Sequence, residues 1–510
     1  MSPTSEQWSQ LAECMADRWW RISNLYRIKD TSGREIRFTP NSAQARLWRD
    51  LHPLNVIPKA RQLGFSTFIA MFITDTCVFR PNTAAGIVDM TVDDAKAKLE
   101  KIAFAYDGLP AEIRKRIPLT KRNAFDLEWA NGSSVSVGTS HRGGTLQILH
   151  VSEFGKIAAK HPEKAREIRT GAFGTVHMGQ MIFVESTAEG TGGDFYDLVT
   201  EADEQKRLGR KLSQQQFKLH FFPWWLHPSY VDDPDLVTVP REMTEYFAVL
   251  EAKHSVVLSP AQRAWYVLKR KSIGPDDMLR EYPSILEEAF QASVEGAYFK
   301  TQMLKARETG RIGKVPLDPS RTVNTFWDIG KGDNTCIWFH QSHGQMHHFI
   351  DYYENSGEGV EHYAKVLRER QIARNWTYGK HYGPHDLDNS HWVLPGAKAV
   401  VDVARGLGIN FIVVPRIPDK ASSIEAARNM ISMSWFDEEF CGQGIKCLDN
   451  YRKEWDDKRA TYKSDPLHDW ASHGADAFQT GACGFTPEYV PPPDDRYRSS
   501  SRSSGSAWAA

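Results

Sequence analysis

The sequence predicts an α/β protein in which strands alternate with helices around parallel sheets. Short apolar stretches at 55–58, 84–88 and 146–151 are typical of buried strands, and the stretches that follow them have a helical pattern. The predicted strands at 146–151 and 180–184 end in polar residues. In a parallel α/β sheet such residues gather at the carboxyl edge, where ligands bind. We therefore expect a parallel α/β fold with a site at that edge.

Changes of composition divide the chain into four segments. A length of 510 residues is enough for roughly two to four domains. We expect a first α/β domain with an N-terminal extension at 1–214, a linking subdomain rich in aromatic residues and proline at 215–314, a second α/β domain at 315–485 and a disordered tail at 486–510. The second domain opens with three predicted strands that resemble a meander, at 323–329, 335–341 and 345–353.

Overall charge does not explain any binding of nucleic acid. The net charge is -1 and the pI is about 7.0, so such binding would depend on local basic patches. Three patches exist: 114–116 with 121–122, 206–207 with 210–211, and 269–271. The six cysteines lack the paired spacing of a zinc site, and we interpret them as reduced thiols of a cytosolic protein. We expect neither a signal peptide nor a membrane span.

The loop after the strand at 55–58 has an incomplete phosphate-binding pattern. A P-loop reads Gly, four residues, Gly-Lys and Ser or Thr, so that backbone amides cradle phosphates and the lysine reaches them. Gly64 and Ser66 stand in that register, but Phe65 fills the lysine position and Lys59 the position of the first glycine. Either the pattern is a coincidence, or the positive charge enters the phosphate site from the start of the loop.

The strand at 146–151 supports a nucleotide site. It ends in Ser152-Glu153, where Glu153 is placed to orient a water for attack on the γ-phosphate and Ser152 replaces the usual metal-ordering Asp. Ser66 offers a hydroxyl ligand to the Mg²⁺ that accompanies ATP. Further candidates are Thr67 beside Ser66, Arg61 for the γ-phosphate, Arg142 as an arginine finger and Gln44 for adenine. The competing interpretation is a buried strand with a chance Ser-Glu ending.

Acidic residues of the second α/β domain predict a divalent metal site. Asp328 lies near the end of a strand, Asp386 follows a turn, and Asp469 and Asp476 are seven residues apart on a predicted helix, so both can share a face. Three such carboxylates can hold two divalent ions, Mg²⁺ or Mn²⁺, about 3.5–4 Å apart, the arrangement that cleaves phosphodiesters. The alternative is a transition-metal site in which aspartates are joined by histidines, namely His385, His468 and His473.

Five groups of residues, in this order, resemble the large terminase subunit of tailed bacteriophages, the motor that packages DNA into procapsids. They are Ala60-Arg61-Gln62-Leu63-Gly64, His150-Val151-Ser152-Glu153-Phe154, Glu185-Ser186-Thr187-Ala188-Glu189-Gly190, Glu281-Tyr282-Pro283 with Glu287-Glu288-Ala289-Phe290, and the run from Asp469 to Ala477. The resemblance covers about 41–482. It implies an N-terminal P-loop ATPase of the ASCE type and a C-terminal nuclease with an RNase H-like mixed sheet.

The resemblance also implies roles for single residues. Glu153 would be the catalytic glutamate and Arg61 the loop arginine. Ser186, Thr187 and Ala188 would form the segment that couples hydrolysis to movement, and Asp328, Asp386 and Asp476 would be the nuclease metal ligands, with Asp469 as an additional candidate. Some terminases carry the lysine at the start of the loop, where Lys59 stands. Phe65 and Ser152 depart from the family pattern.

The partners implied by the resemblance are those of a packaging motor. They are ATP with Mg²⁺, two divalent ions in the nuclease site, double-stranded DNA, the small terminase subunit and the portal of the procapsid. The chain would form a ring when packaging, exist as a monomer in solution, and work in the host cytoplasm. Its DNA contacts would be largely to phosphate, because a motor must tolerate any sequence.

Two other functions remain open from the sequence. A helicase-nuclease of DNA repair would need a second motor domain with its own helicase motifs, and we find none. A non-catalytic DNA-binding or capsid-docking protein with a decayed ATP site is favoured by Phe65 and Ser152. Glu153 and the acidic residues of the second domain count against it.

Overall fold

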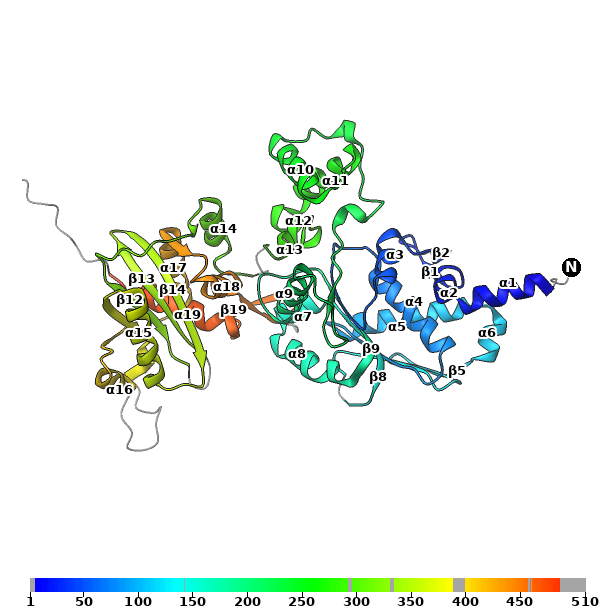
Figure 1. The fold of residues 1–510 in the computed structure, drawn as a ribbon, viewed down its shortest axis with the longest axis horizontal. Helices are drawn as coiled ribbons and strands as arrows, with labels where there is room; N and C mark the ends of the chain where they lie inside the picture. Colours follow the sequence, from blue (N-terminus) through cyan, green and yellow to red (C-terminus); the bar gives the residue numbers. More distant parts are fainter. Residues whose placement is uncertain are drawn as a thin grey trace, which may run out of the picture. The chain divides into compact units, whose positions relative to one another are not determined.

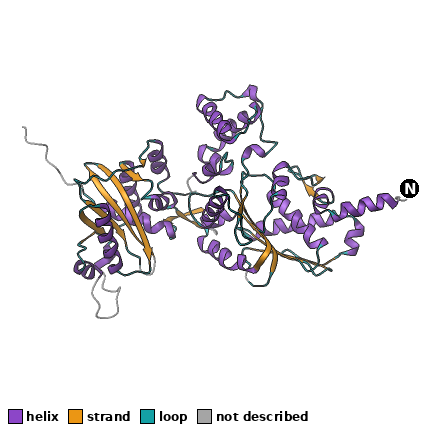
Figure 2. Cartoon of the chain, viewed as in Figure 1, coloured by secondary structure: helices purple, strands orange, loops and turns teal. Residues whose placement is uncertain are grey.

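The chain folds into two compact units, each built around its own sheet. The computed structural model describes residues 5–141, 143–291, 296–330, 334–388, 400–456, 459 and 461–486. One unit comprises Met1–Ala297 with Arg452–Leu467, and the other comprises Tyr298–Tyr451 with His468–Ala510. Both contain strands and helices, so the α/β prediction is confirmed (Figures 1 and 2).

The first unit contains an eight-stranded, mostly parallel sheet in the order β10-β3-β9-β8-β4-β7-β6-β5. Its strands are β3 (Leu54–Pro58), β4 (Ala84–Val88), β5 (Leu119–Arg122), β6 (Asp126–Trp129), β7 (Ser134–Gly138), β8 (Leu146–Ser152), β9 (Val176–Ser186) and β10 (Lys218–Leu219). Only the pairs β5–β6 and β6–β7 are antiparallel. Strand β9 lies between β3 and β8 and pairs with both in parallel. An inserted strand of this kind is the arrangement expected of an ASCE-type P-loop domain.

Alternate residues of these strands face two different cores. Ile57 and Phe183 belong to a cluster with helices α4 and α5, whereas Val56 and Val184 belong to a cluster with α7, α8 and α9. This alternation follows from the two-residue repeat of a strand buried on both faces. The helices of this part are α1 (Ser5–Ala16), α2 (Arg18–Asn24), α3 (Ser42–Arg49), α4 (Phe65–Phe79), α5 (Val92–Asp107), α6 (Ala111–Arg116), α7 (Phe154–Lys160), α8 (Pro162–Glu167) and α9 (Asp194–Arg207), beside the small hairpin β1 (Arg27–Lys29) and β2 (Glu35–Arg37).

The region after β10 is helical and packs around aromatic side chains. It contains α10 (Arg241–His254), α11 (Pro260–Ile273), α12 (Pro275–Glu281) and α13 (Leu286–Gln291). Trp224 is fully buried, with its ring 5.4 Å from that of Trp265 and 5.0 Å from that of Tyr266. These rings extend the α4–α5 core, so residues up to Ala297 group with the first unit. The fourfold division of the chain into 1–214, 215–314, 315–485 and 486–510 stays a prediction.

The second unit contains a seven-stranded mixed sheet in the order β11-β17-β14-β13-β12-β15-β16. Its strands are β11 (Ile312–Gly313), β12 (Val323–Asp328), β13 (Asn334–His343), β14 (Met346–Ser356), β15 (Tyr378–Gly383), β16 (Phe411–Val413) and β17 (Ser434–Asp437). The antiparallel meander β12–β13–β14 is continued beyond β12 by the parallel strands β15 and β16. This is the RNase H-like order, and the predicted meander is confirmed.

Helices cover both faces of the second sheet. Phe326 and Trp338 pack in one core with α17 (Lys420–Ser432), α18 (Gly442–Asn450) and α19 (Trp470–Gly484). Trp327 and Ile337 pack on the other face with α15 (Val360–Arg374) and α16 (Val400–Gly406). The remaining helix of this unit is α14 (Lys300–Glu308), and the hairpin β18 (Lys453–Asp456) and β19 (Thr461–Pro466) belongs to the first unit.

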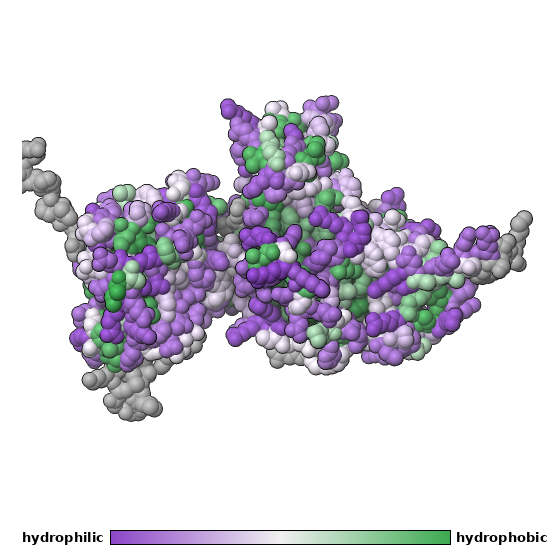
Figure 3. Space-filling model, viewed as in Figure 1, coloured by the Kyte–Doolittle hydropathy of each residue, from purple (hydrophilic) through white to green (hydrophobic). Residues whose placement is uncertain are grey.

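Helix hydropathy, the polar surface and the cysteines are the remaining features of the fold. No described helix is both long and apolar enough to cross a membrane. The face drawn in Figure 3 is mainly hydrophilic, with apolar residues in separate patches. All six cysteines are free thiols, as predicted.

Candidate functional site

The loop between β3 and α4 has the backbone shape of a phosphate-binding turn. Gln62 and Gly64 have left-handed φ angles of 59° and 76°, and Gly64 caps the start of α4. A β-carbon at Gly64 would lie 2.7 Å from the amide nitrogen of Gln44, so only glycine fits. A non-glycine residue such as Gln62 keeps this conformation only where its surroundings enforce it, which is common at functional sites.

Gln44 holds this loop in place. It is almost fully buried, and its Nε2 donates to the carbonyl of Gly64 at 2.8 Å while its Oε1 accepts from the backbone of Asn41. Asn41 in turn caps α3 and donates from Nδ2 to the carbonyl of Leu63. The contact of Gln44 with adenine stays a prediction, and its observed partners belong to the loop.

Phe65, in the usual lysine position, points into the core. Its side chain is 1% exposed and its ring lies 4.5 Å from that of Phe222, which follows β10. The backbone of Phe222 accepts a hydrogen bond from Ala60, so the partner of Phe65 is itself bound to the loop. An aromatic residue here fixes the start of α4 by packing rather than by charge.

Replacing Phe65 with Ala should therefore mainly reduce stability. Truncation of a buried phenylalanine costs about 3–5 kcal/mol of unfolding free energy. Urea unfolding followed by tryptophan fluorescence measures the loss, and Phe65→Leu should recover most of it. Loss of nucleotide binding by a Phe65→Ala protein with unchanged stability would contradict this packing role.

Lys59 lies at the start of the loop and is paired with a buried glutamate. Its side chain is 8% exposed, and Nζ lies 3.3 Å from Oε2 of Glu185 on β9. Burial lowers the pKa of Lys59, but the charges of Glu185 and Glu153 outweigh it and raise the pKa above its usual value. The ammonium group therefore stays charged at the point where the loop begins.

Glu185 is the centre of a polar cluster that sequence reasoning missed. Its oxygen Oε1 accepts hydrogen bonds from the hydroxyls of Ser66 and Ser152 and lies 3.2 Å from Nε2 of His150. Burial raises the pKa of Glu185, but the charge of Lys59 and the bonds from His150 and Ser66 lower it well below the usual range. The sequence offered one signal for this residue, a glutamate directly after the predicted strand at 180–184. The roles that the resemblance implies begin only at the next residue, Ser186.

Glu153 follows β8 in a strained conformation. Its φ angle is 54°, it is the residue before α7, and its Oε2 lies 2.9 Å from Nζ of Lys156. The side chain is 28% exposed, although its Oε2 atom is buried. Left-handed backbone at a glutamate costs about 1–3 kcal/mol and persists where structure or function demands it.

The predicted coupling segment packs directly against α7. The carbonyl of Ser186 accepts from the backbone of Lys59, and the hydroxyls of Ser186 and Thr187 are buried without a hydrogen-bond partner among the described residues. Ala188 is 1% exposed. A β-carbon at Gly155 would lie 2.6 Å from the carbonyl of Thr187. The segment and the helix that follows Glu153 are therefore in close contact.

Two further basic residues lie at the loop. Arg61 is about half exposed and pairs with Glu281 at 2.9 Å, and its backbone amide donates to the carbonyl of Glu281. Its γ-phosphate contact stays a prediction. Lys101 on α5 donates to the hydroxyl of Thr67 at 3.4 Å, a second cation that the sequence pattern did not reveal. Arg142 lies outside the described residues.

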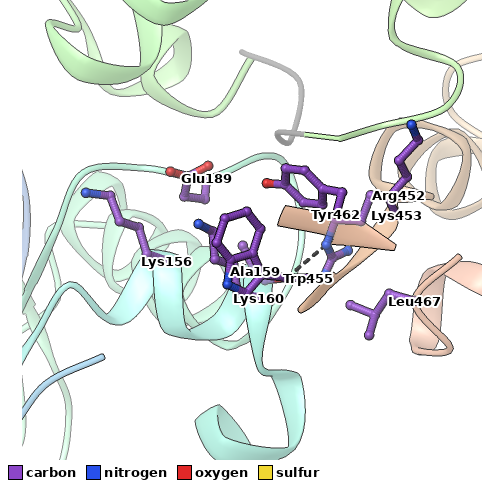
Figure 4. A pocket seen from close by; sticks show the side chains of 9 residues that line it. All are labelled: Lys156, Ala159, Lys160, Glu189, Arg452, Lys453, Trp455, Tyr462 and Leu467. Atoms are coloured by element: carbon purple, nitrogen blue, oxygen red, sulfur yellow. Dashed lines mark hydrogen bonds between the residues drawn. The ribbon is translucent and has the colours of Figure 1, made fainter. Parts of the chain in front are cut away.

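The hairpin β18–β19 contacts α7 (Figure 4). Arg452 donates from Nε to the carbonyl of Ala159 at 2.8 Å, and Nζ of Lys160 lies 4.0 Å from the ring centre of Trp455. Lys156 and Glu189 line the same small pocket. The helix after Glu153, the segment after Thr187 and the hairpin therefore all contribute residues to the lining of this pocket.

In the second unit, Asp328, Asp386 and Asp476 line one cavity of about 260 Å³. Asp328 ends β12 and, two residues after Phe326, faces the side of the sheet covered by α19. Asp386 lies in the turn after β15, and Asp476 lies on α19. The sheet order makes β15 a direct neighbour of β12, and α19 packs against both strands, so all three aspartates border the same cavity.

Asp476 and Asp328 have polar partners beside the cavity. Asp476 accepts from Lys420 at 2.7 Å and from Gln479 at 2.9 Å, and Asp328 lies 3.3 Å from Nδ1 of His473. Burial raises the pKa of Asp328, and the charges of Asp476 and Asp386 add to this, against the opposing bond from His473. Such mutual repulsion among carboxylates is relieved by a cation.

Asp469 and the histidines are placed differently. Asp469 caps α19 by accepting from the backbone of Ala471, and it does not line the cavity. His468 contacts the hydroxyl of Ser472, while His385 lines the cavity. Among the residues that the structure describes, no three His, Cys, Asp or Glu side chains are already arranged to hold a metal ion. Lys420 would have to leave Asp476 before this carboxylate could bind one.

Comparisons with known proteins give structural neighbours only. No family model and no curated protein matches the chain. The large terminase of bacteriophage HK97 is 12% identical, with 91% of this chain and 99% of that chain covered and a TM-score of 0.43. The large terminase of the thermophilic bacteriophage D6E is 12% identical, with 87% and 98% covered and a TM-score of 0.31. That terminase has also been solved in complex with ATP-γ-S.

A third neighbour matches a smaller part of the chain. It is the large terminase nuclease of the thermophilic phage G20c with bound cobalt, 12% identical, with 37% of this chain and 98% of that chain covered and a TM-score of 0.26. At these identities and scores the likeness carries no argument about chemistry, which rests on the residues of this chain. The structural neighbours across nearly the full chain are phage large terminases, at low sequence identity.

Proposed function

We propose that the chain is an ATP-driven translocase that packages double-stranded viral DNA into procapsids and cuts the concatemer with a metal-dependent nuclease. The observation that carries the proposal is the first unit's strained, charged loop. Its lysine and its helix-start serine follow β3, the glutamate follows β8, and β9 lies between these two parallel strands. This edge is where α/β sheets bind phosphates.

In this proposal different residues at the loop bind the phosphates, accept the proton of water and bind Mg²⁺. Backbone amides at the start of α4 and the ammonium of Lys59 hold the phosphates. Glu153 accepts a proton from the attacking water, and its position after β8, with a side chain that is 28% exposed, supports that role. Mg²⁺ would supply charge neutralisation of the β- and γ-phosphates. Ser66 fits as one of its ligands, since its hydroxyl already contacts a carboxylate.

The second unit would carry the nuclease. Asp328, Asp386 and Asp476 offer oxygen ligands that suit Mg²⁺ or Mn²⁺, and their shared cavity supports a common site. Two divalent ions would supply water activation and stabilisation of the leaving oxygen. Arg416 and Lys420 line the same cavity and are placed to meet the phosphates of the substrate. The small terminase subunit, the portal and a ring of subunits belong to this proposal as its partners.

The non-catalytic alternative is weakened by the surroundings of the two departures from the P-loop pattern. Phe65 packs on Phe222, so its position needs no lysine to be ordered. Ser152 hydrogen-bonds Glu185, which keeps a carboxylate at that edge of the sheet. A combined assay tests the proposal: ATP hydrolysis with and without DNA, beside Mg²⁺- or Mn²⁺-dependent cleavage of a plasmid. A folded protein with neither activity would refute it.

Replacing Lys59 with Met should weaken ATP binding about 10- to 100-fold, because a hydrogen bond to a charged group is worth about 1.5–3 kcal/mol. A fluorescent ATP analogue measures the affinity. The Lys59→Met change would also leave Glu185 as an unpaired buried charge, so a thermal melt must show that the variant is folded. Lys59→Arg keeps the charge and is the matched control. Wild-type affinity in folded Lys59→Met would exclude Lys59 from the phosphate site.

A further inference from the structure

Strand β9 places a buried carboxylate where the end of β8 lacks one. P-loop NTPases hold Mg²⁺ with the loop Ser or Thr and an Asp at the end of a neighbouring strand. Here that strand position is Ser152, and its direct partner in the parallel register is Glu185. The same residue pairs across the other edge of β9 with Ile57, one residue before β3 ends. Glu185 therefore lies between the two strands that form the site.

We propose that Glu185 supplies the carboxylate of the Mg²⁺ site, together with Ser66, in place of an Asp at position 152. This inference rests on the proposed ATPase function and deepens it. In this arrangement the carboxylate that orders the metal lies on β9 instead of β8. It still contacts the first turn of α4, through the hydroxyl of Ser66.

The contacts of Glu185 carry the inference. Oε1 accepts from the hydroxyl of Ser66, the residue whose oxygen is the expected metal ligand, and from Ser152 at 3.1 Å. Oε2 is buried and has no hydrogen-bond partner among the described residues, although Nζ of Lys59 lies 3.3 Å away. One carboxylate thus faces both the beginning of the phosphate loop and the beginning of α4.

The chemistry of this arrangement suits Mg²⁺. The ion takes oxygen ligands, keeps several waters and uses one or two carboxylates with substrate phosphates. Glu185 and Ser66 leave the remaining positions to phosphate and water. His150 and Ser152 support the carboxylate from β8, and such supporting bonds orient a ligand and set its affinity.

A purely structural role is the competing explanation, in which Glu185 only neutralises Lys59 in the core. The two roles differ in what Mg²⁺ does to nucleotide affinity. If Glu185 orders the ion, Mg²⁺ and nucleotide binding are coupled through this residue, and coupling of about 5- to 150-fold is typical of linked sites. If Glu185 only neutralises Lys59, its replacement changes stability but leaves the effect of Mg²⁺ unchanged.

The test is equilibrium binding of a fluorescent ATP analogue to the full-length chain, in EDTA and in saturating Mg²⁺. In Glu185→Gln, a nearly isosteric change, we expect affinity in EDTA within about 3-fold of wild type and a Mg²⁺-dependent gain that falls at least about 5-fold. Glu189→Gln is the matched control, because Glu189 is a glutamate of the same segment whose side chain is only 8% exposed and pairs with Arg280. It should keep the wild-type Mg²⁺ effect.

A rescue variant, which restores a carboxylate at the site, gives a second test. Ser152→Asp in the Glu185→Gln background returns a carboxylate to β8, next to the replaced side chain, and should restore the Mg²⁺ effect to within about 3-fold of wild type. If Glu185→Gln does not fold, Glu185→Asp keeps the charge beside Lys59 with a side chain one methylene shorter, and should still reduce the Mg²⁺ effect.

The outcomes separate this inference from the proposed function. A wild-type Mg²⁺ effect in folded Glu185→Gln, or in Glu185→Asp if only that variant folds, overturns the role of Glu185 and leaves the ATPase proposal standing. A wild-type chain that binds no nucleotide in either condition overturns both. Loss of the Mg²⁺ effect in Glu185→Gln with recovery on adding Ser152→Asp supports the shifted metal site.

Discussion

Glu153→Gln is expected to lower ATP turnover about 100- to 10,000-fold, the range that a positioned general base contributes. The amide keeps the size of the side chain but cannot accept the proton of the attacking water. The side chain is 28% exposed, and its buried Oε2 atom lies 2.9 Å from Nζ of Lys156. Steady-state phosphate release with saturating ATP measures the effect. Binding of the ATP analogue should stay within about 3-fold of wild type, since the loss falls on the chemical step.

The matched control is Glu163→Gln, a change at an exposed glutamate of the nearby helix α8. Turnover should be unchanged in this variant. Plasmid cleavage should be unchanged in both variants, because the nuclease residues belong to the second unit. Normal turnover in Glu153→Gln would remove Glu153 from the catalytic role and revive the non-catalytic alternative.

Asp328→Asn is expected to reduce metal-dependent plasmid cleavage at least about 100-fold, because loss of a metal ligand removes several kcal/mol of transition-state stabilisation. Burial raises the pKa of Asp328, and the charges of Asp476 and Asp386 add to this, against the opposing bond from His473. The asparagine removes charge without changing the packing of β12. Cleavage in Mn²⁺ and in Mg²⁺, followed on an agarose gel, gives the readout.

Asp469→Ser provides the control on the same acidic segment. Serine is also a good helix cap, so α19 should keep its start, and the carboxylate lost is one that does not line the cavity. Cleavage should stay near the wild-type rate and ATP turnover should not change. Persistent cleavage by Asp328→Asn, or equal loss in Asp469→Ser, would refute the assignment of ligands.

The parts of the fold that depend on local pattern are readable from the sequence. The strand at 84–88 is found with the predicted bounds, and Asn41 caps the helix α3 that follows it. Apolar runs and capping residues act over a few positions, so one sequence suffices to find them. The acidic residues of the second unit are also recognisable from the local sequence. Asp328 ends a strand, Asp386 follows one, and Asp476 lies on a helix.

Contacts that depend on the order of the strands cannot be predicted from the local sequence. Ser152 and Glu185 are 33 residues apart and become neighbours only because β9 pairs with β8. Phe65 departs from the P-loop pattern, and the residue that explains it, its packing partner Phe222, lies 157 residues further along the chain. Lys101 reaches Thr67 only through the packing of α5 on α4. Contacts of this kind arise from tertiary structure, where local propensity carries no information.

The placement of the hairpin β18–β19 has a consequence for dissecting the molecule. Because Arg452–Leu467 groups with the first unit while the chain on either side groups with the second, the polypeptide passes between the units three times. A single cut after Ala297 therefore cannot release either unit intact. It would strip the first unit of Trp455 and Arg452 and leave Lys160 and the carbonyl of Ala159 uncovered. Isolation of a stable motor fragment requires the hairpin to be grafted back or supplied as a separate peptide.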